Sequence, residues 1–349
     1  MTLLTTTTHT YSTGYGSAGG QREDLSDVIY DLFPEDTWAV TNLDKEKANA
    51  TYTEWLGQSL AAPTANAQLE GDDASFDALT APSRFGSYLQ ISAKTFIVSD
   101  SLESVSKAGR SSELARGAMV KMRELKRDIE TRIVQNGIST AGGAGTARTT
   151  AGMEAWIGDA TASAGGASHV VLATTSASST TPPISSGTPG TAITDGTTTG
   201  AFTSTNLNYA LQGAWADGGD ATTILLTAKQ KALLDGFTSV ATRMVDVSRT
   251  QQASITGAAN IYVSDFGVHK VILNRYGRDS VVLCLDPSMW AIRFLREFKS
   301  RPLARTGDAE KRQIIAEWAL VCRNPLASSK LLLALDVTTG EGAKAPSFI

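Results

Sequence analysis

The chain has 349 residues, of which 42% are hydrophobic and 19% are charged. This composition is typical of a globular protein with a sizeable core, and the length favours about two domains. The formal net charge of -4 argues against a dedicated nucleic-acid binder, which usually carries a strongly basic domain. The sequence contains no run of about 18 apolar residues, so it predicts no membrane-spanning helix, and its N-terminus does not resemble a signal peptide. We therefore expect a soluble protein made inside a cell, with no membrane partner and with Cys284 and Cys322 as free thiols.

The N-terminal region divides into a polar stretch and a short apolar one. Residues 1–22 are mostly Thr, Ser and Gly and contain too few apolar residues to fold alone, so we expect an arm that needs another surface. Residues 23–38 are predicted to contain a helical turn that Pro34 ends. Four apolar side chains can share one face of this turn, namely Val28, Ile29, Leu32 and Phe33.

Residues 51–98 are predicted to be extended. Two segments in this range alternate apolar and polar residues, and a polar connector with Pro63 and Pro82 separates them. The second segment, RFGSYLQISAKTFIVS, contains Phe85, Tyr88, Ile91 and Phe96. The pattern predicts a projecting β-arm. Because an isolated two-stranded arm is marginal in water, this arm needs a partner surface.

The clearest helix is predicted over residues 111–137. Its apolar residues recur at spacings of three and four and form one narrow stripe, made of Leu114, Ala118, Met122, Leu125, Ile129 and Ile133. The other faces are charged, and Asn136-Gly137 is expected to end the helix in the left-handed conformation. At about 1.5 Å per residue the helix would span roughly 40 Å, which suits a spine along an extended subunit.

The second half of the chain alternates helix and strand patterns. The Ala-, Gly-, Ser- and Thr-rich stretch of residues 160–205 is expected to be a surface insertion. Residues 206–290 predict a compact α/β unit with a mixed sheet, and the tail after residue 290 is predicted to be rich in strands.

Motifs for chemistry are missing from the sequence. There is no GxxxxGK[ST] phosphate loop and no GxSxG elbow. His9, His169 and His269 lie in three different regions without metal-ligand spacing, and we expect His269 at a surface or a strand edge. We therefore expect no catalytic, cofactor-binding or metal-binding residues, and no enzyme.

Residues 293–312 form the most informative charged segment. Seven basic side chains stand there against three acidic ones. The segment is either a solvated, partly self-paired surface, a contact with a neighbouring subunit, or a non-specific contact with DNA phosphates. Between the last two we favour the subunit contact.

The order of four segments resembles the major capsid (major head) proteins of tailed bacteriophages. These segments are EDLSDVIYDLFPEDTW, ELARGAMVKMRELKRDIE, NIYVSDFGVHKVILNR and LDPSMWAIRFLREFKSRPLARTGDAEKRQIIAEWALVCRNPLAS. The resemblance implies an α+β fold, the one common to tailed-phage and herpesvirus capsids. Its implied parts are an N-terminal arm (1–50), an extended β-hairpin loop (51–97), a peripheral domain with a spine helix (98–155), an axial α/β domain (156–285) and a return to the peripheral domain (286–349).

The implied function is a structural one. Copies of the chain would form hexamers and pentamers of an icosahedral head that encloses phage dsDNA, located in the virion and assembled in the host cytoplasm. Separate scaffold, portal and decoration proteins are possible partners. The alternative is another virion protein, such as a tail-tube, decoration or adhesin protein. The expected subunit-interface residues are Val28, Ile29, Phe33, Trp55, Phe85, Tyr88, Ile91, Phe96, Arg293, Arg296, Glu297, Arg301, Arg305 and Asp308.

Overall fold

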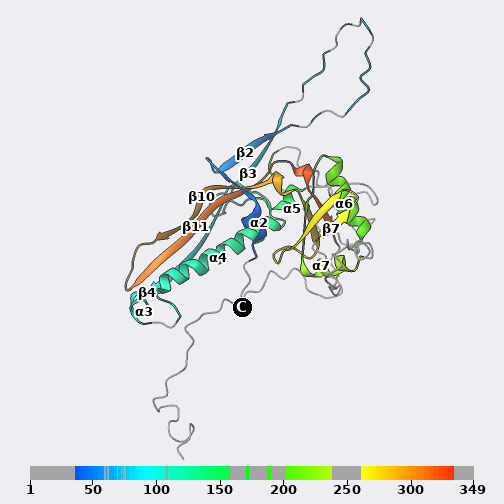
Figure 1. The fold of residues 1–349 in the computed structure, drawn as a ribbon. Helices are drawn as coiled ribbons and strands as arrows, with labels where there is room; N and C mark the ends of the chain where they lie inside the picture. The colour runs from blue at the N-terminus through cyan, green and yellow to red at the C-terminus, as the bar shows by residue number, and fades with distance from the viewer. Residues whose placement is uncertain are drawn as a thin grey trace, which may run out of the picture.

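The computed structural model describes residues 36–58, 60, 63–68, 70–71, 73, 76–79, 81–106, 109–157, 170–172, 187–189, 202–237 and 261–333. These residues form two units, each built on a sheet, and a hairpin that projects from the body (Figure 1). Among them, no helix is long and apolar enough to cross a membrane. Both cysteines are free and buried.

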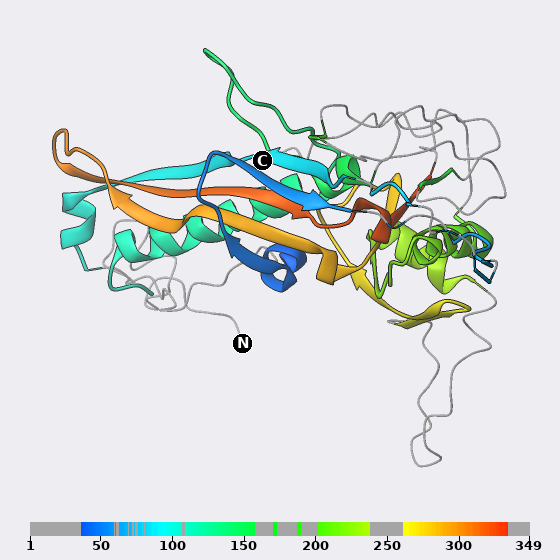
Figure 2. The same ribbon diagram turned by 90° about the horizontal axis from the view of Figure 1, so that it is seen from above.

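The first unit is a long four-stranded sheet with one helix along it. The strands lie in the order β1 (Asp44–Lys47), β10 (Trp290–Pro302), β11 (Ala309–Cys322) and β4 (Gln90–Ser99). Helix α4 (Glu113–Val134) runs along one face of this sheet, and Figure 2 shows it beside the long strands. Its apolar stripe explains this position, because Leu125, Ile129 and Ile133 are buried in one cluster with side chains of β10 and β11. The predicted spine helix is confirmed, with a length of about 33 Å.

The end of α4 differs from the expectation. The helix ends at Val134, and Gln135 already has extended backbone angles, so a left-handed end at Gly137 is wrong. Arg132 holds the chain that follows the helix, because its Nη2 donates to the carbonyl oxygens of Ile138 at 2.7 Å and Thr150 at 2.8 Å. The guanidinium occupies the space beside Gly137, where any β-carbon would collide with it.

The second unit is a six-stranded mixed sheet with helices packed on it. Its strands lie in the order β5 (Val170–Leu172), β12 (Ser329–Leu332), β9 (Val281–Leu285), β6 (Thr223–Leu226), β8 (Gly267–Leu273) and β7 (Ile261–Ser264). Helices α6 (Ser204–Ala216) and α7 (Ala228–Asp235) belong to the same unit (Figures 1 and 2). Every residue of β6 and β9 is buried, which accounts for their continuous apolar sequences. The predicted α/β unit with a mixed sheet is confirmed.

Strand β12 corrects the expected role of the C-terminal segment. It pairs with β9 and β5 in the six-stranded sheet, so residues 286–349 do not all return to the unit of the spine helix. Only β10 and β11 do so among the described strands of that segment. All four residues of β12 are buried, which fits an inner strand of the second sheet.

The two units share one apolar cluster. It combines Ile129 and Ile133 of α4 with Leu225 of β6 and Leu283 of β9, and it includes Trp156 of the short helix α5 (Met153–Trp156). A separate cluster lies under α6 within the second unit. The units are therefore packed against each other through side chains that belong to both.

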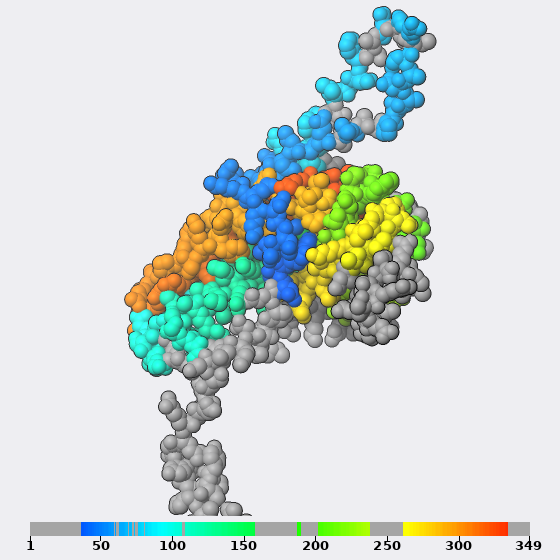
Figure 3. All heavy atoms as spheres, viewed as in Figure 1, coloured from blue at the N-terminus to red at the C-terminus, as the bar shows by residue number. Residues whose placement is uncertain are grey.

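The projecting hairpin consists of β2 (Tyr52–Gly57) and β3 (Ser83–Tyr88), paired antiparallel from Tyr52–Tyr88 to Gly57–Ser83. The described residues of the connecting segment, residues 58–82, stand clear of the body in Figure 3. The predicted two-stranded arm is thus confirmed for residues 52–88. The expected continuation of the second strand is wrong, because after the buried Leu89 the chain enters β4 of the four-stranded sheet.

Candidate subunit interface

The projecting loop, residues 58–82, exposes large apolar side chains. Leu60, Phe76 and Leu79 are 95%, 97% and 98% exposed. The loop also contains four acidic residues and no basic one. Side chains exposed to this degree on a projecting loop are free to contact a partner surface. The sequence prediction missed these three residues because they are spaced irregularly in a polar segment. The presence of acidic residues without any basic one could have marked the segment as a candidate contact surface.

The root of the hairpin is packed within the subunit. Trp55 lies opposite Phe85, with ring centroids 6.4 Å apart, and also contacts the ring of Trp156 at 5.3 Å. Phe85 is only 7% exposed, so its own subunit already covers most of this ring, and its role at a subunit interface stays a prediction. Tyr88 is partly buried against Tyr52, at 4.5 Å between ring centroids. These aromatic rings anchor the hairpin.

The four-stranded sheet has an open face turned away from α4. Phe96 of β4 faces the helix, because a β-carbon on Gly117 would lie 2.8 Å from its ring. Its neighbours in the strand alternate to the other side. The exposed residues of this open face are Ile91, Ala93, Thr95 and Ile97 of β4 and Lys299 and Arg301 of β10. Of the predicted interface residues, Ile91 and Arg301 therefore lie on this open face, whereas the Phe96 side chain points to the opposite face, toward α4.

Most basic residues of the 293–312 segment are paired within the chain. Arg296 Nε donates to the buried Glu317 at 2.8 Å, and Arg148 Nη2 reaches the other carboxylate oxygen of Glu317 at 2.9 Å. At the tip of the sheet, Arg305 contacts Asp100 at 2.5 Å. Asp308 accepts a hydrogen bond from the Ser101 hydroxyl at 3.2 Å. These contacts favour the self-paired surface for much of the segment.

Arg293 belongs to a second charge network at the edge of the sheet. Its Nε donates to Glu46 of β1 at 2.6 Å, and Arg323 Nη2 donates to the same carboxylate at 2.6 Å. Although burial opposes the effect, the hydrogen bonds from Arg323 and Arg293 lower the pKa of Glu46. The network fastens β1, and with it the start of the described chain, to β10.

Three charged side chains near the tip of the four-stranded sheet remain available for contact with another subunit. Glu297, Lys299 and Arg301 are exposed and have no ion-pair partner among the described residues. Glu297 lies within the irregular stretch of β10 between Phe294 and Lys299, and Lys299 and Arg301 lie where regular pairing with β11 resumes. This places free charge at the outer end of the sheet, beside the apolar side chains of the open face.

Two groups of predictions lie wholly or mostly outside the described residues. Val28, Ile29 and Phe33 are in the undescribed N-terminal segment, and their interface role stays a prediction. The same holds for most of the expected insertion at 160–205.

His269 is buried rather than at a surface, which corrects that expectation. It is 2% exposed, Nε2 lies 2.6 Å from the Ser264 hydroxyl, and Nδ1 lies 2.5 Å from the carbonyl oxygen of Ala221. Burial lowers the pKa of His269. The Ser264 hydroxyl also accepts from the backbone N–H of Phe266, so this pair closes the turn between β7 and β8. Within the described part of the chain, no three His, Cys, Asp or Glu side chains cluster as a metal site.

The comparisons with known proteins agree with this geometry. A model of the SU10 major capsid protein family matches residues 4–334. The chain belongs to this family. It is accordingly a capsid-forming structural protein of phage heads, and the family resemblance seen in the sequence is confirmed.

Solved structures with similar folds include capsid subunits. The chain is similar to the capsid of the native GTA particle (13% identity, TM-score 0.62, covering 93% of this chain and 100% of the other). It is also similar to the capsid of cyanophage A-1(L), with 12% identity, a TM-score of 0.62 and coverage of 90% and 97%. A structure from Gordonia phage Cozz has 14% identity, a TM-score of 0.55 and coverage of 92% and 95%. At these identities the likeness concerns the fold, and the predicted capsid fold is confirmed. No curated protein matches the chain significantly.

Proposed function

We propose that copies of this chain assemble into hexamers and pentamers that close an icosahedral phage head around dsDNA. The observation that carries the proposal is the position of two surfaces. In Figure 1 the projecting loop and the tip of the four-stranded sheet lie at opposite ends of the molecule. A contact between different surfaces of identical subunits repeats around an axis and closes into a ring when the rotation allows it.

The two surfaces are complementary in charge and in apolarity. The loop offers Leu60, Phe76 and Leu79 among acidic side chains, and the open face offers Ile91 and Ile97 beside basic ones. Apolar contact would supply affinity, while opposite charges would orient the approach of the subunits. We therefore assign the loop of one subunit to the open face of its neighbour.

The same proposal gives the chain a structural rather than a catalytic role in the virion. Arg293, Arg296 and Arg305 already have carboxylate partners, which leaves less free positive charge for DNA phosphates along this segment. Contacts with packaged DNA, and separate scaffold, portal and decoration proteins, remain part of the proposal, as does assembly in the host cytoplasm. The alternative of a tail-tube or adhesin protein would call for a mostly β fold, whereas α4 alone has 22 residues.

Charge reversal tests the assigned contact. We expect the double variants K299E/R301E and D73K/D77K each to form few particles in negative-stain electron microscopy, because each places like charges across the contact. Combining all four substitutions should restore particles. A matched control, K126E/K270E, makes the same change in charge as K299E/R301E, at exposed positions of α4 and β8, and should assemble normally.

The possible results distinguish an error in the assigned contact between loop and open face from an error in the proposed head-forming function. If the combined variant fails while the control assembles, the pairing of these two surfaces is wrong, although a capsid could still form through others. If the unaltered chain yields only open tubes of uniform width with all the proposed partner proteins present, the tail-tube alternative replaces the head. Circular dichroism of each variant checks that the subunit itself is folded.

A further inference from the structure

Residues 274–279, in the loop between β8 and β9, contact the first unit at several points. Asn274 Nδ2 donates to Glu130 Oε1 of α4 at 3.0 Å. Arg275 Nε donates to Asp36, just before α2, at 3.0 Å. The Tyr276 hydroxyl accepts from Arg127 Nε of α4 at 3.0 Å. One short loop of the six-stranded unit thus reaches both the spine helix and the start of the described chain.

Glu130 joins three parts of the molecule in a buried site. Its side chain is fully buried, and its two oxygens accept the backbone N–H groups of Ala39 at 3.0 Å and Val40 at 2.9 Å. These groups lie in the first turn of α2 (Trp38–Asn42), the root of the N-terminal arm. The first N–H groups of a helix have no hydrogen-bond acceptor within that helix, and here the carboxylate of another helix is their acceptor. Because Asn274 shares Oε1 with Ala39, the arm root and the six-stranded unit bind the same carboxylate.

A second contact holds the other side of the loop. Glu154 of α5 is 1% exposed, and Arg278 Nε lies 3.1 Å from each of its carboxylate oxygens, with Nη2 bound to one of them as well. The buried Lys330 of β12 donates from Nζ to the backbone carbonyl of Glu154 at 2.8 Å. This contact ties α5 to two segments of the six-stranded unit.

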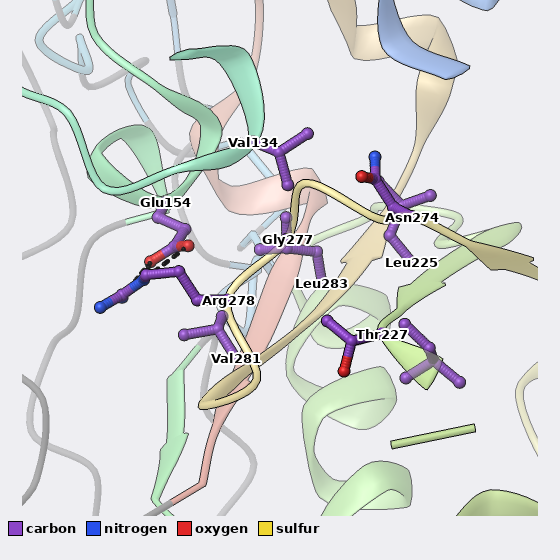
Figure 4. A pocket seen from close by; sticks show the side chains of 10 residues that line it. Val134, Glu154, Leu225, Thr227, Asn274, Gly277, Arg278, Val281 and Leu283 are labelled. Atoms are coloured by element: carbon purple, nitrogen blue, oxygen red, sulfur yellow. Dashed lines mark hydrogen bonds and ion pairs between the residues drawn. The ribbon is translucent and has the colours of Figure 1, made fainter. Parts of the chain in front are cut away.

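A small pocket lies between the two contacts. Figure 4 shows Arg278 and Asn274 on opposite sides of it, with Gly277 between them and Val134, the last residue of α4, at its edge. Leu225 of β6 also lines the pocket, so both units contribute to its wall. Residues beside a void lose contacts that a close-packed core would have, so the packing between the units is incomplete at this point.

We propose that the 274–279 loop is the joint that sets the angle between the two units, with Glu130 and Glu154 as its two locks. The Glu130 lock also holds the arm root. A change of angle that withdraws Asn274 therefore weakens the hold on α2, so movement of the six-stranded unit is transmitted to the N-terminal arm. This inference rests on contacts within one subunit and does not depend on how subunits meet.

Hydrogen–deuterium exchange of the full-length, unassembled chain tests the joint. Asn274→Asp keeps the oxygen that accepts from the Tyr276 N–H and replaces the donor to Glu130 with a carboxylate. We expect exchange at the Ala39 and Val40 amides to become about tenfold faster, as for the loss of one hydrogen bond to a charged group. The Asn274 side chain bonds to Glu130 and to the Tyr276 N–H rather than to α2, so this effect would have to pass through Glu130.

A matched variant and a reporter keep the test specific. Arg278→Met releases the Glu154 lock and should speed exchange in residues 152–157 without changing α2. Buried amides of β11 report global unfolding and should stay protected in both variants. If Asn274→Asp speeds exchange only around residues 272–279, Glu130 holds α2 independently and the coupling is wrong. If that variant does not fold, Asn274→Ser, which adds no charge, should give the same rise at α2, and an unchanged rate there would also overturn the proposal.

Discussion

Trp55 Nε1 donates a hydrogen bond to the backbone carbonyl of Cys322 across 2.9 Å. This bond joins the projecting hairpin to the last residue of β11, 267 positions along the chain. The Arg293 guanidinium lies 5.7 Å from the centre of the same indole ring. Trp55 was expected at a subunit interface, but within the subunit its role is to fix the direction in which the hairpin leaves the body.

Replacing Trp55 separates its hydrogen bond from its packing. Trp55→Phe loses the bond to Cys322 and keeps an aromatic ring, so we expect the free energy of unfolding to fall by about 1 kcal/mol. Trp55→Ala also loses the packing, for a total of about 3–5 kcal/mol. Urea unfolding measures both. Trp215→Phe is the control, because Trp215 is 61% exposed and should change stability little; equal effects at the two positions would contradict the anchoring role.

Glu317 is predicted to be the most sensitive carboxylate of the sheet. Glu317→Gln leaves the guanidinium groups of Arg148 and Arg296 without their shared counter-charge. Breaking a buried ion pair costs about 3–5 kcal/mol, and since both arginines are partly exposed we expect the lower end of this range. Glu310→Gln removes a partly exposed pair with Arg312 and should cost about 1 kcal/mol or less. Similar urea midpoints for the two variants would argue against a central role of Glu317.

Glu130 gives a pH dependence with a definite sign. Burial raises the pKa of Glu130, although the hydrogen bonds from Ala39, Val40 and Asn274 lower it. The folded chain thus binds this proton more tightly than the unfolded chain. Its contribution to the free energy of unfolding is therefore greatest in acid and falls as the pH rises from about 4.3 through the raised pKa.

Glu130→Gln removes this titration and serves as the reference. The stability of the unaltered chain minus that of the variant should decrease with rising pH in that window and then level off. Urea unfolding at a series of pH values measures the difference. An increase with pH would mean that the hydrogen bonds outweigh burial and that the pKa is lowered.

Gly117 allows the spine helix to approach β4. A β-carbon there would lie 2.8 Å from the Phe96 ring, so Gly117→Ala should destabilise the chain by about 1–2 kcal/mol, after the gain in helix propensity is counted. Phe96→Leu in the same chain should recover part of this loss by making room. Gly143→Ala is the control, since a β-carbon at that position would have no atom within 4 Å. Thermal unfolding of the three variants measures the effect, and an unchanged midpoint for Gly117→Ala would show that the ring moves aside freely.

The local pattern of apolar residues was enough to predict helices and strands. How those strands pair into sheets depends on residues far apart in the chain, so the sequence did not predict it. The spine helix was predictable because its stripe from Leu114 to Ile133 is a local property. The strand at Ser329–Leu332 was predictable too, but its place in the second sheet depends on pairing with β9 and β5, which no local pattern contains.

The candidate interface shows the same division. The basic segment at 293–312 was visible as charge, yet two of the acids that pair with it, Glu46 and Asp100, lie about 200 positions or more earlier in the chain. Phe85 looked available because the residue that covers it, Trp55, belongs to the opposite strand. Leu60, Phe76 and Leu79 were missed because their irregular spacing in a polar segment gives no periodic pattern, and the structure shows that none of the described body folds back over them.

The separation of the projecting loop from the sheet tip has a genetic consequence. A subunit that lacks the loop still presents its open face, so it can receive a neighbour but offers nothing to the next one. Under the proposed contact, such a subunit ends the growth of any ring that includes it. A loop deletion should therefore be dominant over the intact allele in a mixed infection, and its effect on yield should exceed its share of the subunit pool.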